Sequence, residues 1–143
     1  MYREKKVGVI VPAYNEELLL SRTILTLPNF IDKIIVVDDG STDKTAAIAE
    51  SLAENDPRIL LIRHSKNMGV GAAVRTGYIW CRDNDIDIAV VMNGDNQMAP
   101  EDLPDLLNPI VENRADYTKG NRLVSGEAWI WHAERCPRTL KYL

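Results

Sequence analysis

The sequence has few cysteines, no long apolar run and no excess of basic residues, and each shortage argues against a class of protein. Its two cysteines, Cys81 and Cys136, match no metal-binding spacing and no disulfide framework, so two reduced thiols in a cytosolic protein are the simpler interpretation. No apolar run approaches the ~20 residues that span a bilayer. The net charge of -4 argues against a general nucleic-acid binder, which usually presents a basic surface.

What is present is the composition of an ordinary globular domain. With 143 residues, 45% of them hydrophobic and 27% charged, the chain can form one domain that buries roughly two thirds of its unfolded surface. Residues 1–6 lead directly into an apolar strand and not into the apolar segment of a signal peptide. We therefore expect a soluble, cytoplasmic protein.

Short apolar runs alternate with amphipathic segments along most of the chain. The runs predict strands at residues 7–11, 33–37, 58–62, 86–92 and, more weakly, 115–119, with Pro12 ending the first. The intervening segments predict helices at residues 15–27, 42–54 and 69–83, and a fourth that begins at Pro100 and that Pro109 should kink or end early. This order predicts an α/β fold, a largely parallel open sheet with helices on both faces.

Two aspartates follow the most uniformly apolar run, in the segment Asp38-Asp39-Gly40-Ser41-Thr42-Asp43. They stand at the carboxyl end of a predicted buried strand, where open α/β sheets bind their ligands. Asp39 can accept two N–H bonds, which suits the edge of a nucleobase. Gly40 permits a tight turn, and Ser41 or Thr42 can cap the next helix. Asp38 or Asp43 can alternatively satisfy N–H groups of that helix.

The loops after the first and third predicted strands should lie at the same edge of the sheet. In the first, Asn15 is placed to cap a helix, and Tyr14 can pack on a base or ribose or only cover that helix. In the third, Gly69-Val70-Gly71 with Arg75 is either a phosphate cradle or a means of packing the helix closely. We interpret His64 and His132 as structural, because neither has a partner at metal-ligand or triad spacing.

The loop after the fourth predicted strand is the candidate metal site. A cation that bridges the phosphates of a nucleoside diphosphate requires hard oxygen ligands. Asp95 offers a carboxylate, and Asn93 and Gln97 offer side-chain carbonyl oxygens. Gly94 would let the phosphates approach the backbone. An isolated Asn-Gly pair is also a common turn, so this site depends on its neighbours.

Together these loops resemble the family 2 glycosyltransferases, which have the GT-A fold. The resemblance covers about residues 7–122, and its closest branch is that of the dolichol-phosphate mannosyltransferase-like enzymes, which move a sugar from a nucleotide donor to a polyprenyl phosphate. It is carried by Val9-Ile10-Val11-Pro12-Ala13-Tyr14-Asn15-Glu16, the aspartate segment 38–43, residues 67–77, residues 93–103 and Lys119-Gly120-Asn121-Arg122.

The resemblance implies roles for individual residues. The donor-binding residues would be Pro12, Ala13, Tyr14, Glu16, Asp38, Asp39, Gly69 and Arg75. Asp95 would bind Mg²⁺ or Mn²⁺ with help from Asn93 and Gln97, and the catalytic residues would be Asp95 and Arg122, which faces a phosphate. Two positions depart from the family pattern: Asn93 stands where an aspartate is usual, and Val70 where a lysine is frequent.

The resemblance also divides the chain into a nucleotide-sugar-binding core, residues 1–122, and an aromatic and basic tail, residues 123–143, in which we expect no strand. This tail would begin a missing or reduced acceptor region. Its residues Trp129, Trp131, Tyr142, Arg135, Arg138 and Lys141 either contact anionic lipid or cover an edge of the sheet. We therefore allow for peripheral contact with the cytoplasmic face of a membrane, and a homo-oligomer is left open.

The function that follows is transfer of a sugar from a GDP- or UDP-sugar to an acceptor such as a polyprenyl (dolichyl) phosphate. The alternative is a non-catalytic nucleotide-sugar-binding or partner module that lacks the acceptor half. A nicotinamide dehydrogenase is disfavoured because the first strand leads to Pro12-Ala13-Tyr14 and not to a glycine-rich fingerprint. A sugar-phosphate nucleotidyltransferase would also need glycines and a basic residue in that loop. The sequence identifies no general base.

Overall fold

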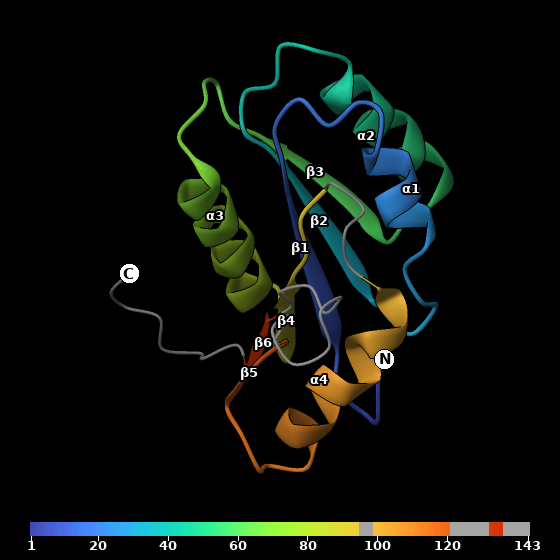
Figure 1. The fold of residues 1–143 in the computed structure, drawn as a ribbon, viewed down its shortest axis with the longest axis vertical. Helices are drawn as coiled ribbons and strands as arrows, with labels where there is room; N and C mark the ends of the chain where they lie inside the picture. The colour runs from blue at the N-terminus through green and yellow to red at the C-terminus, as the bar shows by residue number, and fades with distance from the viewer. Residues whose placement is uncertain (95–98, 121–131, 136–143) are drawn as a thin grey trace.

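Four parallel strands of mostly apolar residues form one side of the sheet. They are β1 (Val7–Ala13), β2 (Lys33–Asp38), β3 (Ile59–Arg63) and β4 (Ile88–Val91). The structure is a computed structural model that describes residues 1–94 and 99–120 together with the backbone of 132–135. The order of strands in the sheet is β3-β2-β1-β4-β6-β5, so β1 lies between β2 and β4 (Figure 1).

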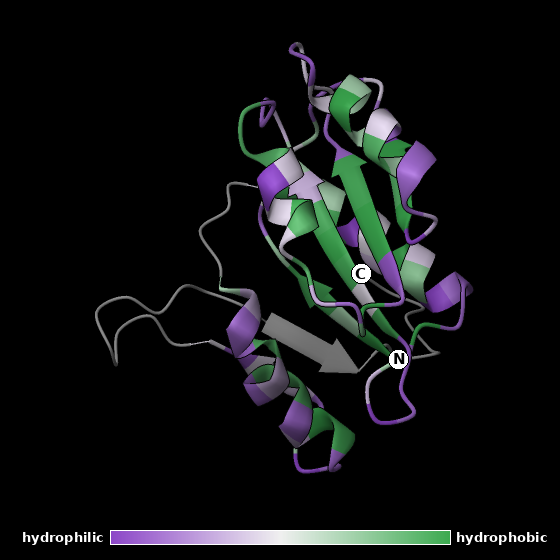
Figure 2. Cartoon of the chain, turned by 90° about the vertical axis from the view of Figure 1, so that its right-hand side faces the viewer, coloured by the Kyte–Doolittle hydropathy of each residue, from purple (hydrophilic) through white to green (hydrophobic). Residues whose placement is uncertain are grey.

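Helices cover both faces of this sheet, as predicted. One face carries α1 (Leu20–Leu25), α2 (Thr45–Asn55) and α4 (Leu103–Val111), whose buried side chains pack with those of Val9 and Val11. The opposite face carries α3 (Val70–Asp83). With helices on both faces, every residue of β1 is buried, which explains the uninterrupted apolar runs, drawn green in Figure 2.

Close packing of α3 depends on a glycine in the middle of that helix. A Cβ atom built on Gly77 would lie 2.3 Å from Cγ2 of Ile10 in β1. A Cβ built on Gly69 or Gly71, by contrast, would meet no heavy atom of the described residues within 4 Å. The suggestion that Gly69 and Gly71 serve to pack this helix is therefore wrong, and Gly77 has that role.

The first strand continues through Pro12 to Ala13, so the prediction that Pro12 ends it was wrong. The carbonyl oxygen of Ile10 accepts a hydrogen bond from Met92 on the β4 side of the strand. Backbone groups alternate in direction along a strand, so the nitrogen of Pro12 faces the same side as Ile10. Because β4 ends opposite Ile10, no ladder hydrogen bond is lost at Pro12.

Helix α1 begins at Leu20, five positions later than the predicted cap Asn15. Asn15 has a φ of 53°, the left-handed region, and a cap has an extended backbone. Helix α2 begins at Thr45 after Lys44, so neither Ser41 nor Thr42 caps it. The loop that contains Asn15 and the loop that contains Ser41 and Thr42 form hydrogen bonds with each other instead, as described below. Helix α4 follows a 3₁₀ turn, Pro100–Asp102, and continues through Pro109 to Val111.

The sheet also contains a strand that the sequence did not predict. Residues His132–Arg135 form β6, which runs antiparallel between β4 and β5 (Tyr117–Lys119). The prediction of a tail without a strand was therefore wrong, although β1, β2, β3 and β4 are parallel as expected. No helix among the described residues is both long and apolar enough to cross a membrane.

Candidate functional site

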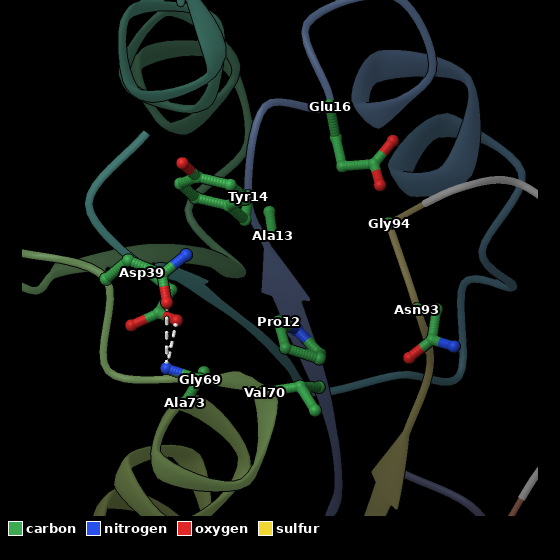
Figure 3. Close-up of a pocket in the computed structure, with 11 residues that line it drawn as sticks. Pro12, Ala13, Tyr14, Glu16, Asp39, Gly69, Val70, Ala73, Asn93 and Gly94 are labelled. Atoms are coloured by element: carbon green, nitrogen blue, oxygen red, sulfur yellow. Dashed lines mark hydrogen bonds between the residues drawn. The ribbon is translucent and has the colours of Figure 1, made fainter. Parts of the chain in front are cut away.

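A pocket of about 310 Å³ lies at the carboxyl ends of the parallel strands. It opens at the boundary between β1 and β4. The strand that follows β1 in the chain, β2, lies on the other side of β1, so the order of strands reverses at this boundary. Open α/β sheets bind ligands at such a reversal of strand order. The loops after all four strands contribute its lining, Pro12, Ala13, Tyr14, Glu16, Asp39, Asn67, Gly69, Val70, Ala73, Asn93 and Gly94 (Figure 3).

Asp39 forms one end of the pocket, and the surrounding loop holds its carboxylate. Its Oδ1 accepts hydrogen bonds from the backbone N–H of Met68 at 2.9 Å and from His64 Nδ1 at 2.7 Å. Its Oδ2 accepts the N–H of Gly69 at 2.8 Å, a bond marked in Figure 3. Burial by itself would raise the pKa of Asp39, but these hydrogen bonds outweigh it and lower the pKa below its ordinary value. Asp39 is therefore a buried, ionised acceptor.

His64 is a part of the site that the sequence reasoning did not identify. Because an ionised carboxylate only accepts, Nδ1 of His64 carries the proton in its bond to Asp39. Its Nε2 lies 2.9 Å from Oγ1 of Thr76 in α3, which fixes the ring. The interpretation of His64 as structural holds in the sense that it positions Asp39. The missed signal was its place, one residue beyond the carboxyl end of β3.

Glu16, Asn93 and Gly94 form the opposite end of the pocket, across from Asp39 and Gly69 (Figure 3). The buried hydroxyl of Thr23 donates a hydrogen bond of 3.2 Å to the carbonyl oxygen of Gly94, which ties the loop after β4 to α1. Glu16 and Asn93 offer a carboxylate and an amide oxygen, both hard ligands. Within the described residues no group of three or more His, Cys, Asp or Glu side chains is placed to hold a metal ion.

The charges of the residues that line the pocket indicate that an anionic ligand would need an accompanying cation. Asp39 and Glu16 are both acidic, and the described lining contains no Lys, Arg or His side chain. A polyanionic ligand placed between two carboxylates would be repelled unless a positive charge accompanied it. The lining alone therefore fits a polar, uncharged ligand group at one end and a cation or cation-bound anion at the other.

Residues 41–45 hold the loop after β1 in place. The backbone N–H of Asn15 donates to Ser41 Oγ at 3.0 Å, and that of Glu16 donates to Thr45 Oγ1 at 2.9 Å. In the other direction, Asn15 Oδ1 accepts the N–H of Thr42 at 2.9 Å. Asp43 accepts the N–H of Thr45 in the first turn of α2, which confirms the structural alternative for that aspartate. Much of the aspartate segment therefore serves to hold the loop after β1 in position.

Several predicted site residues lie elsewhere. Asp38 is fully buried and does not line the pocket; its Oδ1 accepts the N–H of Ser41 and its Oδ2 lies 3.5 Å from Nε of Arg63. Arg75 is exposed on α3 and does not line the pocket either. Val70 does line it, with 64% of its surface exposed. Asp95, Gln97 and Arg122 lie outside the described residues.

The sequence model of the family described as Glycosyl transferase family 2 matches residues 8–135. The chain belongs to this family. The match includes all four strands that border the pocket, together with β5 and β6. The family membership predicted from the loop segments is therefore confirmed.

Curated relatives of this family 2 chain are named for transfer to lipid phosphates. A UDP-N-acetylglucosamine–dolichyl-phosphate N-acetylglucosaminyltransferase of Methanococcus voltae is 35% identical over 84% of this chain and 53% of its own length. A polyprenol monophosphomannose synthase of Mycolicibacterium smegmatis is 37% identical over 86% of this chain and 48% of its own length. The chain thus spans about half the length of these curated relatives.

The fold is shared with solved glycosyltransferases. The mannosyltransferase PcManGT from Pyrobaculum calidifontis, solved in complex with GDP-Man and Mn²⁺, matches with a TM-score of 0.73. The match covers 93% of this chain and 46% of that protein at 20% sequence identity, so it supports the GT-A fold and nothing finer.

Proposed function

We propose that the pocket binds the nucleoside diphosphate part of a nucleotide-sugar, and that this chain supplies the donor-binding core of a glycosyltransferase that acts on a polyprenyl phosphate. The observation that carries the proposal is the pocket itself, in which all four strand-end loops of a family 2 chain meet. The curated relatives support the acceptor class, since their names include dolichyl phosphate and a polyprenol monophosphate sugar.

The two ends of the pocket suit the two ends of a nucleoside diphosphate. At one end, Asp39 is an ionised acceptor for a base N–H group, and the ring of Tyr14, 45% exposed, borders the same side (Figure 3). At the other end, the buried Gly94 brings backbone close to the pocket beside Glu16 and Asn93. The base would therefore lie by Asp39, and the phosphates would lie by Gly94.

A divalent cation, Mg²⁺ or Mn²⁺, fits the phosphate end. Glu16 and Asn93 would contribute hard oxygen atoms there, and the resemblance adds Asp95 and Gln97. When bound, the cation would neutralise charge that develops on the leaving diphosphate. It would also offset the repulsion between the phosphates and the two carboxylates of the lining.

In the proposed reaction, the bond between the anomeric carbon and the diphosphate oxygen breaks, and a bond to the acceptor oxygen forms. A polyprenyl phosphate is already anionic, so its attack needs no strong general base. By the resemblance, Arg122 would face the donor or acceptor phosphate. An acceptor of this kind resides in a membrane, so peripheral membrane contact belongs to the same proposal.

Isothermal titration calorimetry tests donor binding. The wild-type chain should bind UDP or GDP, and Mn²⁺ should tighten the binding. Asp39→Ala should abolish binding with Mn²⁺ present. Asn93→Asp should tighten the binding of Mn²⁺ in the presence of nucleotide, because it adds a carboxylate at the phosphate end. Absence of binding to either nucleotide, with or without Mn²⁺, would end the proposal.

A further inference from the structure

The two edges of the sheet differ in how well they are protected against pairing with another strand. An exposed edge presents unpaired backbone groups, and proteins usually shorten such an edge or place charged residues and proline in it. Strand β5, at one edge of the described sheet, has only three residues and ends in Lys119. Strand β3, at the other edge, has five residues, of which the first four, Ile59-Leu60-Leu61-Ile62, are apolar. The sequence of β3 therefore offers little of the usual protection.

Alternate residues of β3 direct their backbone groups away from the sheet. The carbonyl oxygen of Arg58 and the N–H of His64 both form hydrogen bonds with β2. Backbone groups alternate in direction along a strand, so the even-numbered residues face β2, whereas Ile59, Leu61 and Arg63 face outward. Within the described residues, β2 is the only strand that pairs with β3. The outward groups of Leu61 and Arg63 therefore have no strand partner there.

The outward groups of β3 are complementary to those of a second β3 that runs antiparallel to it. With the pairing centred on Leu61, the two Leu61 residues exchange both of their N–H···O bonds. Two positions along, the N–H of Arg63 meets the outward carbonyl oxygen of Ile59 in the second copy, and symmetry repeats this bond. The N–H of Ile59, which donates to the carbonyl oxygen of Asp56 in its own chain, takes no part in these four bonds.

The side chains of β3 suit the same register. Leu60 would lie opposite Ile62 of the second copy on the face that carries α3, and Leu61 would lie opposite Leu61 on the face that carries α2. All three side chains are only partly buried in the single chain. Pairing would therefore place apolar side chains opposite each other across the two strands, which stabilises a sheet.

Charged groups at the ends of β3 complement each other in this arrangement. Arg63, whose side chain is 57% exposed, would lie opposite Ile59 of the second copy, close to where α2 of that copy ends. The last turn of α2 contains no basic residue, and it includes the exposed Glu54. A cation is favourable beside a carboxylate at the carboxyl end of a helix. Each copy would therefore supply the cation that the other copy's α2 lacks.

We propose that a second copy of this chain docks on β3 by antiparallel, two-fold pairing centred on Leu61. The same patch is used on both copies, so the assembly closes as a dimer with one continuous sheet. The two pockets lie at carboxyl ends of strands that run in opposite directions, and each is lined by residues of one copy. The dimer is therefore independent of the proposed nucleotide binding.

Analytical ultracentrifugation tests for the dimer at chain concentrations from about 10 μM to about 1 mM, a range that detects weak association. The 16.1 kDa chain should convert to a species of twice that mass as its concentration rises. Leu61→Pro removes the N–H at the centre of the pairing and no bond to β2. Leu61→Ala is the matched control, because it also shortens the side chain but keeps the N–H. The proline variant should dimerise about tenfold or more weakly than the alanine variant, and circular dichroism checks both folds.

Amide hydrogen exchange, followed by NMR on the unmodified protein, locates the contact without any substitution. Exchange at Leu61 and Arg63 should slow as the chain concentration rises, because their N–H groups become bonded in the dimer. Exchange at Lys119, in β5 at the other edge, should not depend on concentration.

Three results would overturn the proposal: a chain that stays monomeric up to about 1 mM, a dimer in which exchange at Leu61 does not change, or equal dimerisation of folded Leu61→Pro and Leu61→Ala. Species larger than a dimer would contradict the closed two-fold arrangement as well. None of these results bears on nucleotide binding, and a chain that binds no nucleotide would leave the dimer standing.

Discussion

The backbone N–H of Glu16 donates a hydrogen bond of 2.9 Å to the hydroxyl of Thr45, a fully buried side chain at the start of α2. This contact joins the pocket loop after β1 to the element after β2. Thr45→Val keeps the shape of the side chain and leaves this N–H without its partner. We expect a loss of about 1–3 kcal/mol in the free energy of unfolding, together with weaker nucleotide binding. Urea denaturation and calorimetry measure the two effects.

Thr118→Val is the matched control for that substitution. The hydroxyl of Thr118, in β5, donates to the carbonyl oxygen of Leu106 and lies outside the pocket lining. It should lower stability while the folded protein binds nucleotide as the wild type does. Equal losses of binding in the two variants would contradict a role for the Glu16–Thr45 contact in shaping the pocket.

His64 offers a second pair of variants, because asparagine and glutamine imitate different ring nitrogens. His64→Asn can place an N–H near the position of Nδ1, which donates to Asp39, whereas His64→Gln reaches toward Thr76 instead. We expect His64→Asn to keep most of the nucleotide affinity. His64→Gln should lose roughly tenfold, since a hydrogen bond to a charged group is worth about 1.5–3 kcal/mol. Identical affinities for the two variants would show that His64 does not position Asp39.

We expect opposite effects from substituting the two glycines at the start of α3. Gly69 has a φ of 93°, and its N–H donates to Asp39, so Gly69→Ala should strain the loop and weaken nucleotide binding. Gly71 lies within the helix, and a Cβ there meets no described atom within 4 Å. Gly71→Ala should therefore raise stability by up to about 1 kcal/mol and leave binding intact. Thermal denaturation with calorimetry compares them, and a Gly71→Ala variant that no longer bound would revive the phosphate-cradle alternative.

The lowered pKa of Asp39 predicts how acid affects stability. The folded-state pKa lies below the ordinary value of 3.8, so the ionised group contributes stability at higher pH. That contribution is lost as the pH falls from about 5 through the folded-state pKa. Asp39→Asn removes this titration, so its free energy of unfolding should fall less steeply on acidification than that of the wild type. Parallel slopes in urea denaturation at several pH values would contradict the assignment.

The sequence predicted those parts of the site that follow from strand ends. The apolar run before Asp39 indicated a buried parallel strand, and in such a sheet the loops after neighbouring strands must meet at one edge. Tyr14, Gly69 and Asn93 were identified by the same reasoning, and Glu16 was identified by the family resemblance. The sequence distinguished less well between adjacent residues. Asp38 and Asp39 were both predicted to bind the donor, but only Asp39 lines the pocket.

What the sequence did not predict depends on contacts between distant segments. Strand β6 has a polar sequence and pairs with β4, more than forty positions earlier, so no local pattern indicates it. The late start of α1 follows from Asn15, whose side chain accepts from Thr42 in the next loop instead of capping a helix. His64 lacks a partner in the sequence and finds one, Asp39, only when two strand ends meet.

The most direct test of the nucleotide pocket is to map the amide chemical shifts of the isotope-labelled protein as UDP is added in the presence of Mg²⁺. The largest changes should fall on Tyr14, Asp39, Gly69 and Gly94, which line the pocket from all four loops, while Tyr117–Lys119 in β5 stay unchanged. Shifts that gather on residues away from these loops, or no shift at saturating UDP and GDP, would contradict the account.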